Sequence, residues 1–267
     1  MLGVLGLCRL ALRAVLPVDC ISCARPLRRD PTPYFCDACW HLITPISGPR
    51  CVSCDQPFAS KVVDPWTPAH RCQRCLERPP SYDRAWTLYP YISPLKDAIC
   101  ALKYRQVYSL ANPLGTLMIR ALPEHLDADL IVPVPLHPSR LRDREFNQSL
   151  LLADRLARHL GRPISTTNLV RIVATEPQTS LSRTERLRNL RRVFMVNNVE
   201  LFEGRRVLLI DDVFTTGTTL NECAKALCSV GTASVLALTL ARTMDSNLVP
   251  DRYLAEHSMQ LFAGPRS

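Results

Sequence analysis

The sequence predicts an α/β domain with a mostly parallel sheet flanked by helices, preceded by a small module that metal ions stabilise. One observation is a pair of strand, loop and helix units in the second half of the chain, at residues 129–161 and 205–231. The other is a set of four Cys-x-x-Cys pairs within the first 75 residues. Units of the first kind build parallel sheets, and cysteine pairs with this spacing are typical of zinc sites.

Length and charge set the general expectations. The chain has 267 residues and a formal net charge of +9, which is enough chain for one large core and one small domain. Only four of its 33 basic residues are lysines, and arginine favours bidentate contacts with phosphate. Phosphorylated ligands or nucleic acid are therefore expected partners; the alternative is that the arginine bias reflects genome composition alone.

The N-terminal segment, residues 1–16, is apolar but contains Arg9 and Arg13. The uninterrupted apolar run is too short to span a bilayer, which takes about 20 residues, and charges inside the run argue against a signal peptide. We expect an amphipathic helix that packs on the protein, with peripheral contact to a membrane surface as the alternative.

The cysteine pairs contain eight of the 12 cysteines. Two residues between thiolates let both sulfurs bind one tetrahedral ion, so eight thiolates are expected to hold two structural Zn²⁺ ions. This double zinc ribbon is assigned to residues 17–81. Its expected ligands are Cys20, Cys23, Cys36, Cys39, Cys51, Cys54, Cys72 and Cys75.

Two pairing schemes fit the spacing of these cysteines. Sequential pairing joins the first pair to the second and the third to the fourth, and it is favoured over an interleaved cross-brace because it closes shorter loops. A zinc knuckle also needs a residue that tolerates positive φ after its second thiolate, a position held here by Ala24 and Asp55. The module serves either as a docking or nucleic-acid surface or only to stabilise the fold.

The clearest functional pattern lies at residues 205–220. The apolar residues 207–210 predict a strand, followed by two acids, a polar loop and a helix. This order places the loop at the carboxyl edge of a parallel sheet, where α/β proteins bind ligands. Unpaired amides and threonine hydroxyls meet at the start of the helix, which predicts a phosphate site. Its residues are Thr215, Thr216, Gly217, Thr218 and Thr219.

The two acids before this loop are Asp211 and Asp212. A site for phosphate alone would not favour two anions so close, whereas carboxylates accept hydrogen bonds from the vicinal hydroxyls of a sugar. The combination predicts a site for ribose 5-phosphate.

Two further segments are basic. The unit at 129–161 has a loop with His137, Arg140, Arg142 and Arg144, which either faces a pyrophosphate group or forms a solvated turn. Residues 177–192 contain five arginines and one glutamate. This segment is a lid over an anionic ligand, a nucleic-acid contact or, as the favoured single interpretation, a solvated helix face.

The stretch Asp-Asp-Val-Phe-Thr-Thr-Gly-Thr-Thr at 211–219 resembles the signature of type I phosphoribosyltransferases that binds 5-phosphoribosyl-1-pyrophosphate (PRPP). The resemblance implies that Asp211 and Asp212 hold the ribose 2- and 3-hydroxyls and that residues 215–219 hold the 5-phosphate. It also implies Mg²⁺ that accompanies PRPP, bound mainly through the ligand's own oxygens. Family members that use 6-oxopurines typically have an acid where Thr215 stands, so such an acceptor is not expected.

The whole pattern resembles the ComF family of competence-associated proteins, from about Pro17 to Arg242. The resemblance rests on the cysteine pairs, Val-Pro-Val-Pro-Leu-His-Pro-Ser-Arg at 132–140, Phe-Asn-Gln-Ser at 146–149, Leu-Ser-Arg-Thr-Glu-Arg at 181–186 and the 211–219 loop. Glu145 stands where that family usually has glycine. The resemblance implies a bacterial cytoplasmic protein linked to DNA uptake, with single-stranded DNA and a DNA-uptake helicase as partners.

Two functions stay open at this point. One is transfer of a pentosyl group from PRPP to an unidentified acceptor, with mainly electrostatic catalysis; no residue is assigned as general acid or base. The other is a non-catalytic PRPP sensor that binds DNA or a helicase, although the sequence shows no run of exposed aromatics for base stacking. The phosphoribosyltransferase-like domain is assigned to residues 82–244, and the tail, 245–267, has no predicted role.

Overall fold

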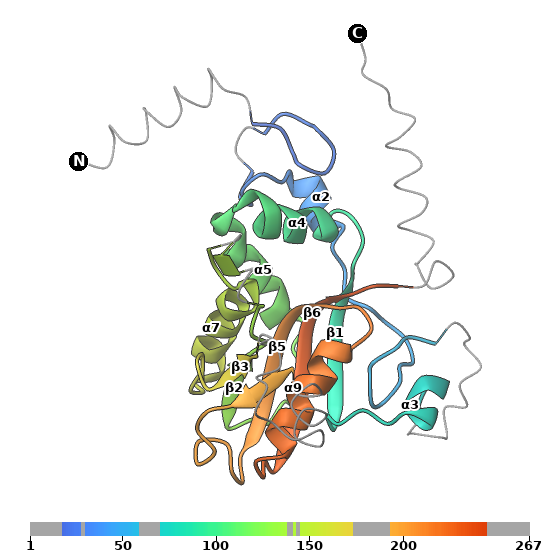
Figure 1. The fold of residues 1–267 in the computed structure, drawn as a ribbon. Coiled ribbons are helices and arrows are strands. Elements are labelled where there is room, and N and C mark those ends of the chain that lie inside the picture. Colours follow the sequence, from blue (N-terminus) through green and yellow to red (C-terminus); the bar gives the residue numbers. More distant parts are fainter. Residues whose placement is uncertain are drawn as a thin grey trace, which may run out of the picture.

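The structure is a computed structural model that describes residues 18–27, 30–58, 70–137, 141–142, 145–172 and 193–244. Its centre is a four-stranded, all-parallel sheet with the strand order β1-β6-β5-β2 (Figure 1). The strands are β1 (Arg84–Pro90), β2 (Leu130–Pro133), β5 (Arg206–Phe214) and β6 (Ser234–Arg242). A short antiparallel pair, β3 (Leu169–Arg171) with β4 (Phe194–Val196), lies outside this sheet. The predicted parallel sheet is confirmed.

Helices cover both faces of the sheet. The helices of the α/β domain are α4 (Leu95–Arg105), the 3-10 turn η1 (Tyr108–Leu110), α5 (Ala111–Arg120), α7 (Gln148–Leu160) and α9 (Thr218–Cys228). Because successive side chains of a strand point to opposite faces, β5 supplies two cores. Leu208 and Ile210 pack with α4, α5 and α7, whereas Val207 and Leu209 pack with α9 and the β3–β4 pair.

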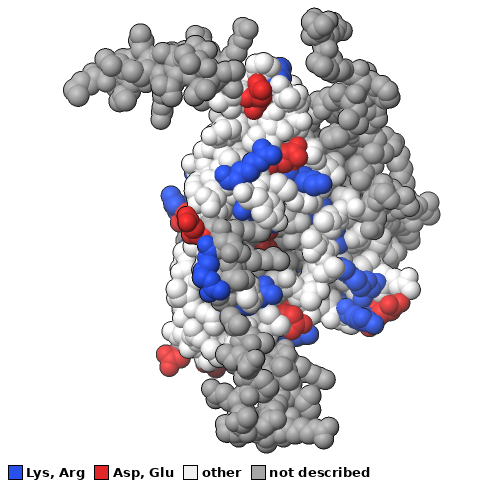
Figure 2. Space-filling view, turned by 45° about the horizontal axis from the view of Figure 1, so that its top comes forward, with Lys and Arg blue, Asp and Glu red and all other residues white. Residues whose placement is uncertain are grey.

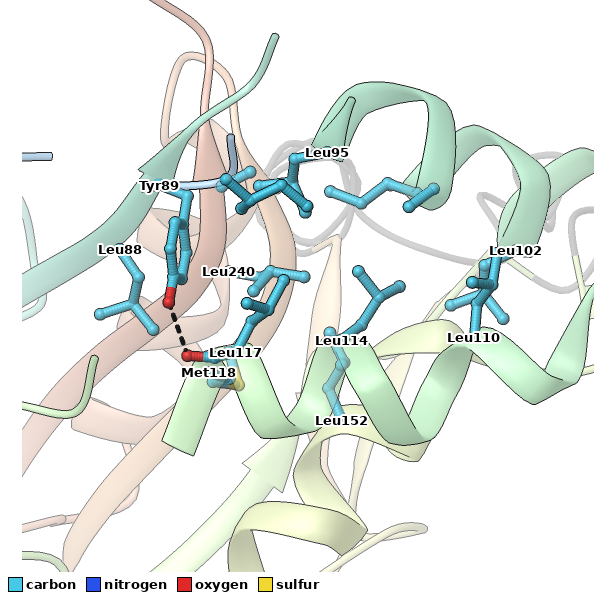
Figure 3. Packing of buried hydrophobic residues seen from close by; sticks show 14 of the residues in the cluster. Leu88, Tyr89, Leu95, Leu102, Leu110, Leu114, Leu117, Met118, Leu152 and Leu240 are labelled. Atoms are coloured by element: carbon cyan, nitrogen blue, oxygen red, sulfur yellow. Dashed lines mark hydrogen bonds between the residues drawn. The ribbon is translucent and has the colours of Figure 1, made fainter. Parts of the chain in front are cut away.

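Leucines of the three helices pack together in the first of these cores (Figure 3). Leu114 and Leu117 of α5 and Leu152 of α7 are buried beside Leu240 of β6. The Tyr89 hydroxyl donates to the Leu117 carbonyl at 2.9 Å, so even the polar end of this buried ring has a partner. Leu152 and Leu156 of α7 are buried in this core, and the helix has Gly161 as its C-cap with φ of +62°.

The strand that precedes the phosphate loop is longer than predicted. The sequence predicts residues 207–210, whereas β5 continues through both acids to Phe214. Its last residue pairs with Arg242 of β6. Backbone pairing with β6 stabilises this extension. Such pairing cannot be predicted from the apolar pattern of the sequence.

The cysteine-rich module is an internal duplication. Each half begins with a knuckle closed by an isolated β-bridge, Asp19 with Pro26 and Arg50 with Pro57. Each then has a five-residue helix, α2 (Asp37–His41) or α3 (Gln73–Glu77), with a cysteine as N-cap. We call these halves the first ribbon (residues 18–43) and the second ribbon (residues 50–78). As predicted, Ala24 and Asp55 adopt positive φ, 57° and 61°.

The two ribbons lie on different parts of the α/β domain (Figure 1). The first packs Phe35 and Ile43 into the core next to α4. The second covers β1, an edge strand of the sheet: the Ala85 amide donates to the Ser53 carbonyl at 2.8 Å, and the Thr87 amide donates to Asp55 Oδ2 at 2.6 Å. Unpaired edge strands invite aggregation, so the second ribbon also protects the sheet.

Several predicted features lie outside the described residues. These are the N-terminal helix (1–16), the arginine segment (177–192), the tail (245–267), and Arg140 and Arg144 of the basic loop. Among the helices that are described, none has the length and hydropathy needed to cross a bilayer.

The duplication permits a matched test of how the second ribbon is held. Asp55 Oδ2 accepts bonds from Thr87 and from Arg50 Nη1 at 3.0 Å. Asp55→Gly keeps the backbone relaxed at positive φ but leaves these donors without their acceptor, so we expect a loss of about 3 kcal/mol in the free energy of unfolding. Ala24→Gly at the equivalent position should change it by less than about 1 kcal/mol. Urea unfolding of zinc-loaded protein measures both, and equal effects would contradict the assigned role of Asp55.

Candidate active site at the end of β5

The paired acids are held by two different helices. Asp211 Oδ1 accepts the Ser149 hydroxyl at 2.8 Å and the Asp212 amide at 2.9 Å. Asp212, only 5% exposed, forms an ion pair with Lys103, with 2.5 Å between Oδ2 and Nζ. Ser149 lies in the first turn of α7 and Lys103 in the last turn of α4. Both acids are therefore positioned by side chains that are distant in the sequence.

The surroundings of Asp211 change its acidity. Desolvation raises the pKa of Asp211 to about 7, and the neighbouring charge of Asp212 acts in the same direction. The Ser149 hydroxyl, the Asp212 amide and the Lys103 charge oppose this rise. Asp211 therefore changes charge near neutral pH, which is unusual for a carboxyl group.

The start of α7 is fixed so that Ser149 reaches Asp211. Asn147 caps the helix by accepting the Ser149 amide at 3.0 Å, and its own Nδ2 donates to the Val134 carbonyl at 3.0 Å. The chain enters this cap through Glu145, whose φ is +63°. That left-handed conformation explains why glycine is usual here in the family that the sequence resembles.

The threonine loop connects β5 to α9. Gly217 is the N-cap of α9 with φ of +77°, and Thr216 Oγ1 lies 2.8 Å from Thr218 Oγ1 and accepts the Thr218 amide at 3.3 Å. The side chains of all four loop threonines are exposed. Amides and hydroxyls thus face solvent at the positive end of an 11-residue helix, which suits a phosphate group.

Gly217 is required for two independent reasons. Its φ lies in the left-handed region, and a Cβ added there would lie 2.5 Å from Cζ of Phe214. The loop therefore lies directly on the ring of the last β5 residue, and no other amino acid fits without a shift of that ring.

The sequence prediction of the site is incomplete. Lys103 and Ser149 were not predicted. Lys103 could have been noticed, because it is one of only four lysines in a chain whose other basic residues are arginines. In the predicted basic loop, His137 is half-buried and Arg142 is exposed.

The cysteines form two clusters of four. One contains Cys20, Cys23, Cys36 and Cys39, and the other Cys51, Cys54, Cys72 and Cys75; the sulfurs within each cluster lie within 4.8 Å of one another. This is the sequential arrangement. The Cys23–Cys36 and Cys54–Cys72 sulfur pairs are each 3.6 Å apart, close to the ~3.8 Å between thiolates around one tetrahedral Zn²⁺ with Zn–S of about 2.3 Å. Four soft thiolates at this spacing fit zinc.

The donor set at the acids is different. Within the described part of the chain, only the two cysteine clusters bring three or more His, Cys, Asp or Glu side chains close enough to share an ion. Among the residues that the structure describes, Asp211 and Asp212 form no such group of three, so they fit a Mg²⁺ that is bound mainly through its ligand's oxygens better than one bound by protein alone.

A glycine pair tests the structure of the loop. Gly217→Ala should lower the free energy of unfolding by about 3 kcal/mol or more, because it combines left-handed strain with a clash against Phe214. Gly204→Ala is the matched control: its φ is +68° but a Cβ there meets nothing within 4 Å, so only the cost of about 1 kcal/mol for strain is expected. Thermal and urea unfolding measure both. Equal losses would show that the Phe214 ring moves aside without a cost in free energy and would contradict this prediction.

The pKa of Asp211 predicts how stability depends on pH. A folded pKa near 7 lies above the unfolded value of about 3.9, so the folded state binds this proton more tightly and stability falls as pH rises between these values. Asp211→Asn cannot ionise and still accepts both hydrogen bonds. We expect it to lose less stability than the wild type between pH 6 and pH 8 in urea unfolding. The control Asp154→Asn, at a half-exposed pair with Arg158, should follow the wild type, and a parallel curve for Asp211→Asn would refute the assignment.

Comparisons with known proteins cover both parts of the chain. Residues 147–262 match the phosphoribosyl transferase domain and residues 11–76 the double zinc ribbon domain. Among solved structures, adenine phosphoribosyltransferase from Thermoanaerobacter pseudethanolicus is 19% identical with a TM-score of 0.33, over 52% of this chain and 83% of that chain, a likeness too weak to carry an argument.

Curated relatives give a closer match. DNA utilization protein YhgH from Escherichia coli strain K12 is 34% identical over 252 residues, which cover 91% of this chain and 98% of the relative. Competence protein F from Haemophilus influenzae is 34% identical over 181 residues, with 65% and 79% covered. Competence protein ComFC from Bacillus subtilis is 29% identical over 223 residues, with 80% and 86% covered. With both domains matched and a relative aligned over nearly its full length, the chain belongs to the ComF family.

Proposed function

We propose that this protein binds PRPP together with Mg²⁺ at the carboxyl end of β5. The observation that supports this most directly is the pair of acids, half-buried Asp211 and buried Asp212, beside an exposed threonine loop at the start of α9. The two acids accept the ribose 2- and 3-hydroxyls. Thr215, Thr216, Gly217, Thr218 and Thr219 hold the 5-phosphate through amides and hydroxyls.

Lys103 adds a cation to this site. It neutralises Asp212 in the ligand-free protein, where an unpaired buried carboxylate would be costly. Bound Mg²⁺ would supply the charge that stabilises a departing pyrophosphate. The protein's own contribution is to orient the ribose through its hydroxyls and to fix the 5-phosphate, so that C1 is held in one place.

The eight clustered cysteines hold two structural zinc ions in this proposal. Each ribbon has a helix of only five residues, too short to be stable alone, so the metal must supply much of the local stability. A reducing compartment keeps such thiolates available, which supports a cytoplasmic location.

With an acceptor, the site is a phosphoribosyltransferase. The bond between C1 and the pyrophosphate oxygen breaks, its electron pair leaves with pyrophosphate, and the acceptor's lone pair forms the new bond to C1. The acids at the end of β5 and the threonine loop assist by holding the ribose and the 5-phosphate in place. The acceptor's proton leaves to solvent or to a basic group of the acceptor.

The second candidate is a PRPP sensor that handles single-stranded DNA. The names of the relatives, DNA utilization protein and competence protein, favour it. The sequence shows no run of aromatics, but the fold exposes two tyrosine rings: Tyr104 is 70% and Tyr108 45% exposed. The Tyr108 ring also lies edge-on to Phe146, with 4.8 Å between centroids. Such rings can stack on bases. On the face seen in Figure 2, however, basic side chains form separate groups with acids beside several of them and no continuous stripe.

Calorimetric titration of PRPP with Mg²⁺ into zinc-loaded protein tests the proposal. We expect saturable binding to the wild type and to Asp154→Asn, and an affinity at least about 100-fold lower for Asp211→Asn combined with Asp212→Asn, because two charged acceptors are lost. All three should contain two zinc ions per chain. Unchanged affinity in the double variant would refute the ligand assignment, and a zinc count of zero in the wild type would refute the metal assignment.

The same samples separate the two functions. Release of pyrophosphate on addition of an acceptor would establish a transferase. Binding without release, together with binding of single-stranded DNA that weakens steeply with salt, would favour the sensor.

A further inference from the structure

The second ribbon contacts the phosphate loop directly. Arg74 Nη1 donates to the Thr216 carbonyl at 3.0 Å, across 142 residues of sequence. Arg74 belongs to α3 and lies between Cys72 and Cys75, two members of the second cysteine cluster. The position of this arginine is therefore set by the cluster, since a helix of five residues does not persist alone.

This hydrogen bond orients the loop. The carbonyl of Thr216 and the amide of Gly217 belong to one planar trans peptide, in which C=O and N–H point in opposite directions. Because the carbonyl faces Arg74, the Gly217 amide faces away from it. Glycine tolerates both signs of φ, so the Thr216–Gly217 peptide could rotate if nothing held it. The bond to Arg74 therefore fixes the direction in which the Gly217 amide points at the start of α9.

Arg242 provides a second connection between this ribbon and the loop, through Phe214. The guanidinium of Arg242, 1% exposed, donates to the Cys54 carbonyl at 2.7 Å and also to Gln56. It also lies 4.4 Å from the centroid of the Phe214 ring, against which Gly217 packs. Arg242 thus contacts the ring on which the loop packs, and Arg74 bonds to the loop itself.

The first ribbon has a different neighbourhood. Its residues Phe35, Cys36 and Ile43 pack into the core with α4. The amides of Cys20, Ile21 and Phe35 donate to carbonyls within the same ribbon. The two metal clusters are therefore placed to have different effects on the site.

We propose that the second ribbon is part of the phosphate site, with Arg74 as a positioning residue that holds the Thr216–Gly217 peptide in its binding orientation. This inference rests on the proposed function, because it assigns the loop to the 5-phosphate of PRPP. It makes the cysteine cluster at residues 51–75 a determinant of PRPP affinity.

Arg74→Met tests this in zinc-loaded, full-length protein. It keeps a long side chain and removes the donors. We expect the affinity for PRPP to fall about 10-fold, the value of one charge-assisted hydrogen bond. Ribose 5-phosphate should lose affinity by the same factor, because it shares the 5-phosphate with PRPP. Arg78→Met is the matched control: Arg78 is exposed at the C-cap of the same helix, and its loss should leave both affinities unchanged.

Hydrogen exchange separates positioning from stability. In ligand-free protein, the amides of residues 215–219 should exchange faster in Arg74→Met than in Arg78→Met, while zinc content and the midpoint of urea unfolding stay equal in the two variants. Equal PRPP affinity and equal loop exchange in both variants would overturn the inference and leave the proposed function intact. No PRPP binding to the wild type would instead overturn the proposed function, and the inference with it.

Discussion

The constraint on which the site depends is a pair of consecutive carboxylates near the end of β5, half-buried Asp211 and buried Asp212. A buried acid is tolerated only with partners, and these partners come from separate crossovers: Ser149 from α7 and Lys103 from α4. The start of one helix and the end of the other are therefore fixed relative to β5. The cap at Asn147, which is tied to the end of β2 through the Val134 carbonyl, then connects the acids to the sheet itself.

The site is costly to the ligand-free fold. Burial raises the pKa of Asp211 to about 7, and Glu145 holds positive φ. Both features lower stability, and neither improves the packing of the core. Strain and unfavourable charge of this kind are typical of sites where a ligand supplies the missing interactions.

The sequence alone predicted those features that depend on residues close together in the chain. The threonine loop, the cysteine pairs and the positive φ of Ala24 and Asp55 depend on residues only a few positions apart. Lys103, Ser149 and Arg74 were not predicted, because each acts on a partner more than 60 residues away and meets it only through the order of the strands. Neither the extension of β5 through the acids nor the order β1-β6-β5-β2 follows from hydrophobic periodicity.

The two ribbons differ at one knuckle position, and this difference affects how each ribbon docks on the α/β domain. At the position after the second knuckle cysteine, the first ribbon has Ala24 and the second has Asp55, with nearly the same φ. Alanine offers the sheet nothing there, whereas the carboxylate of Asp55 accepts the free amide of Thr87 on the edge strand. Docking by Asp55 brings α3 within reach of the β5–α9 loop, and only from that place can Arg74 bond to Thr216. The difference between alanine and aspartate at equivalent positions is therefore one reason why the two ribbons dock differently, together with the bonds of Ser53 and Cys54 to the sheet.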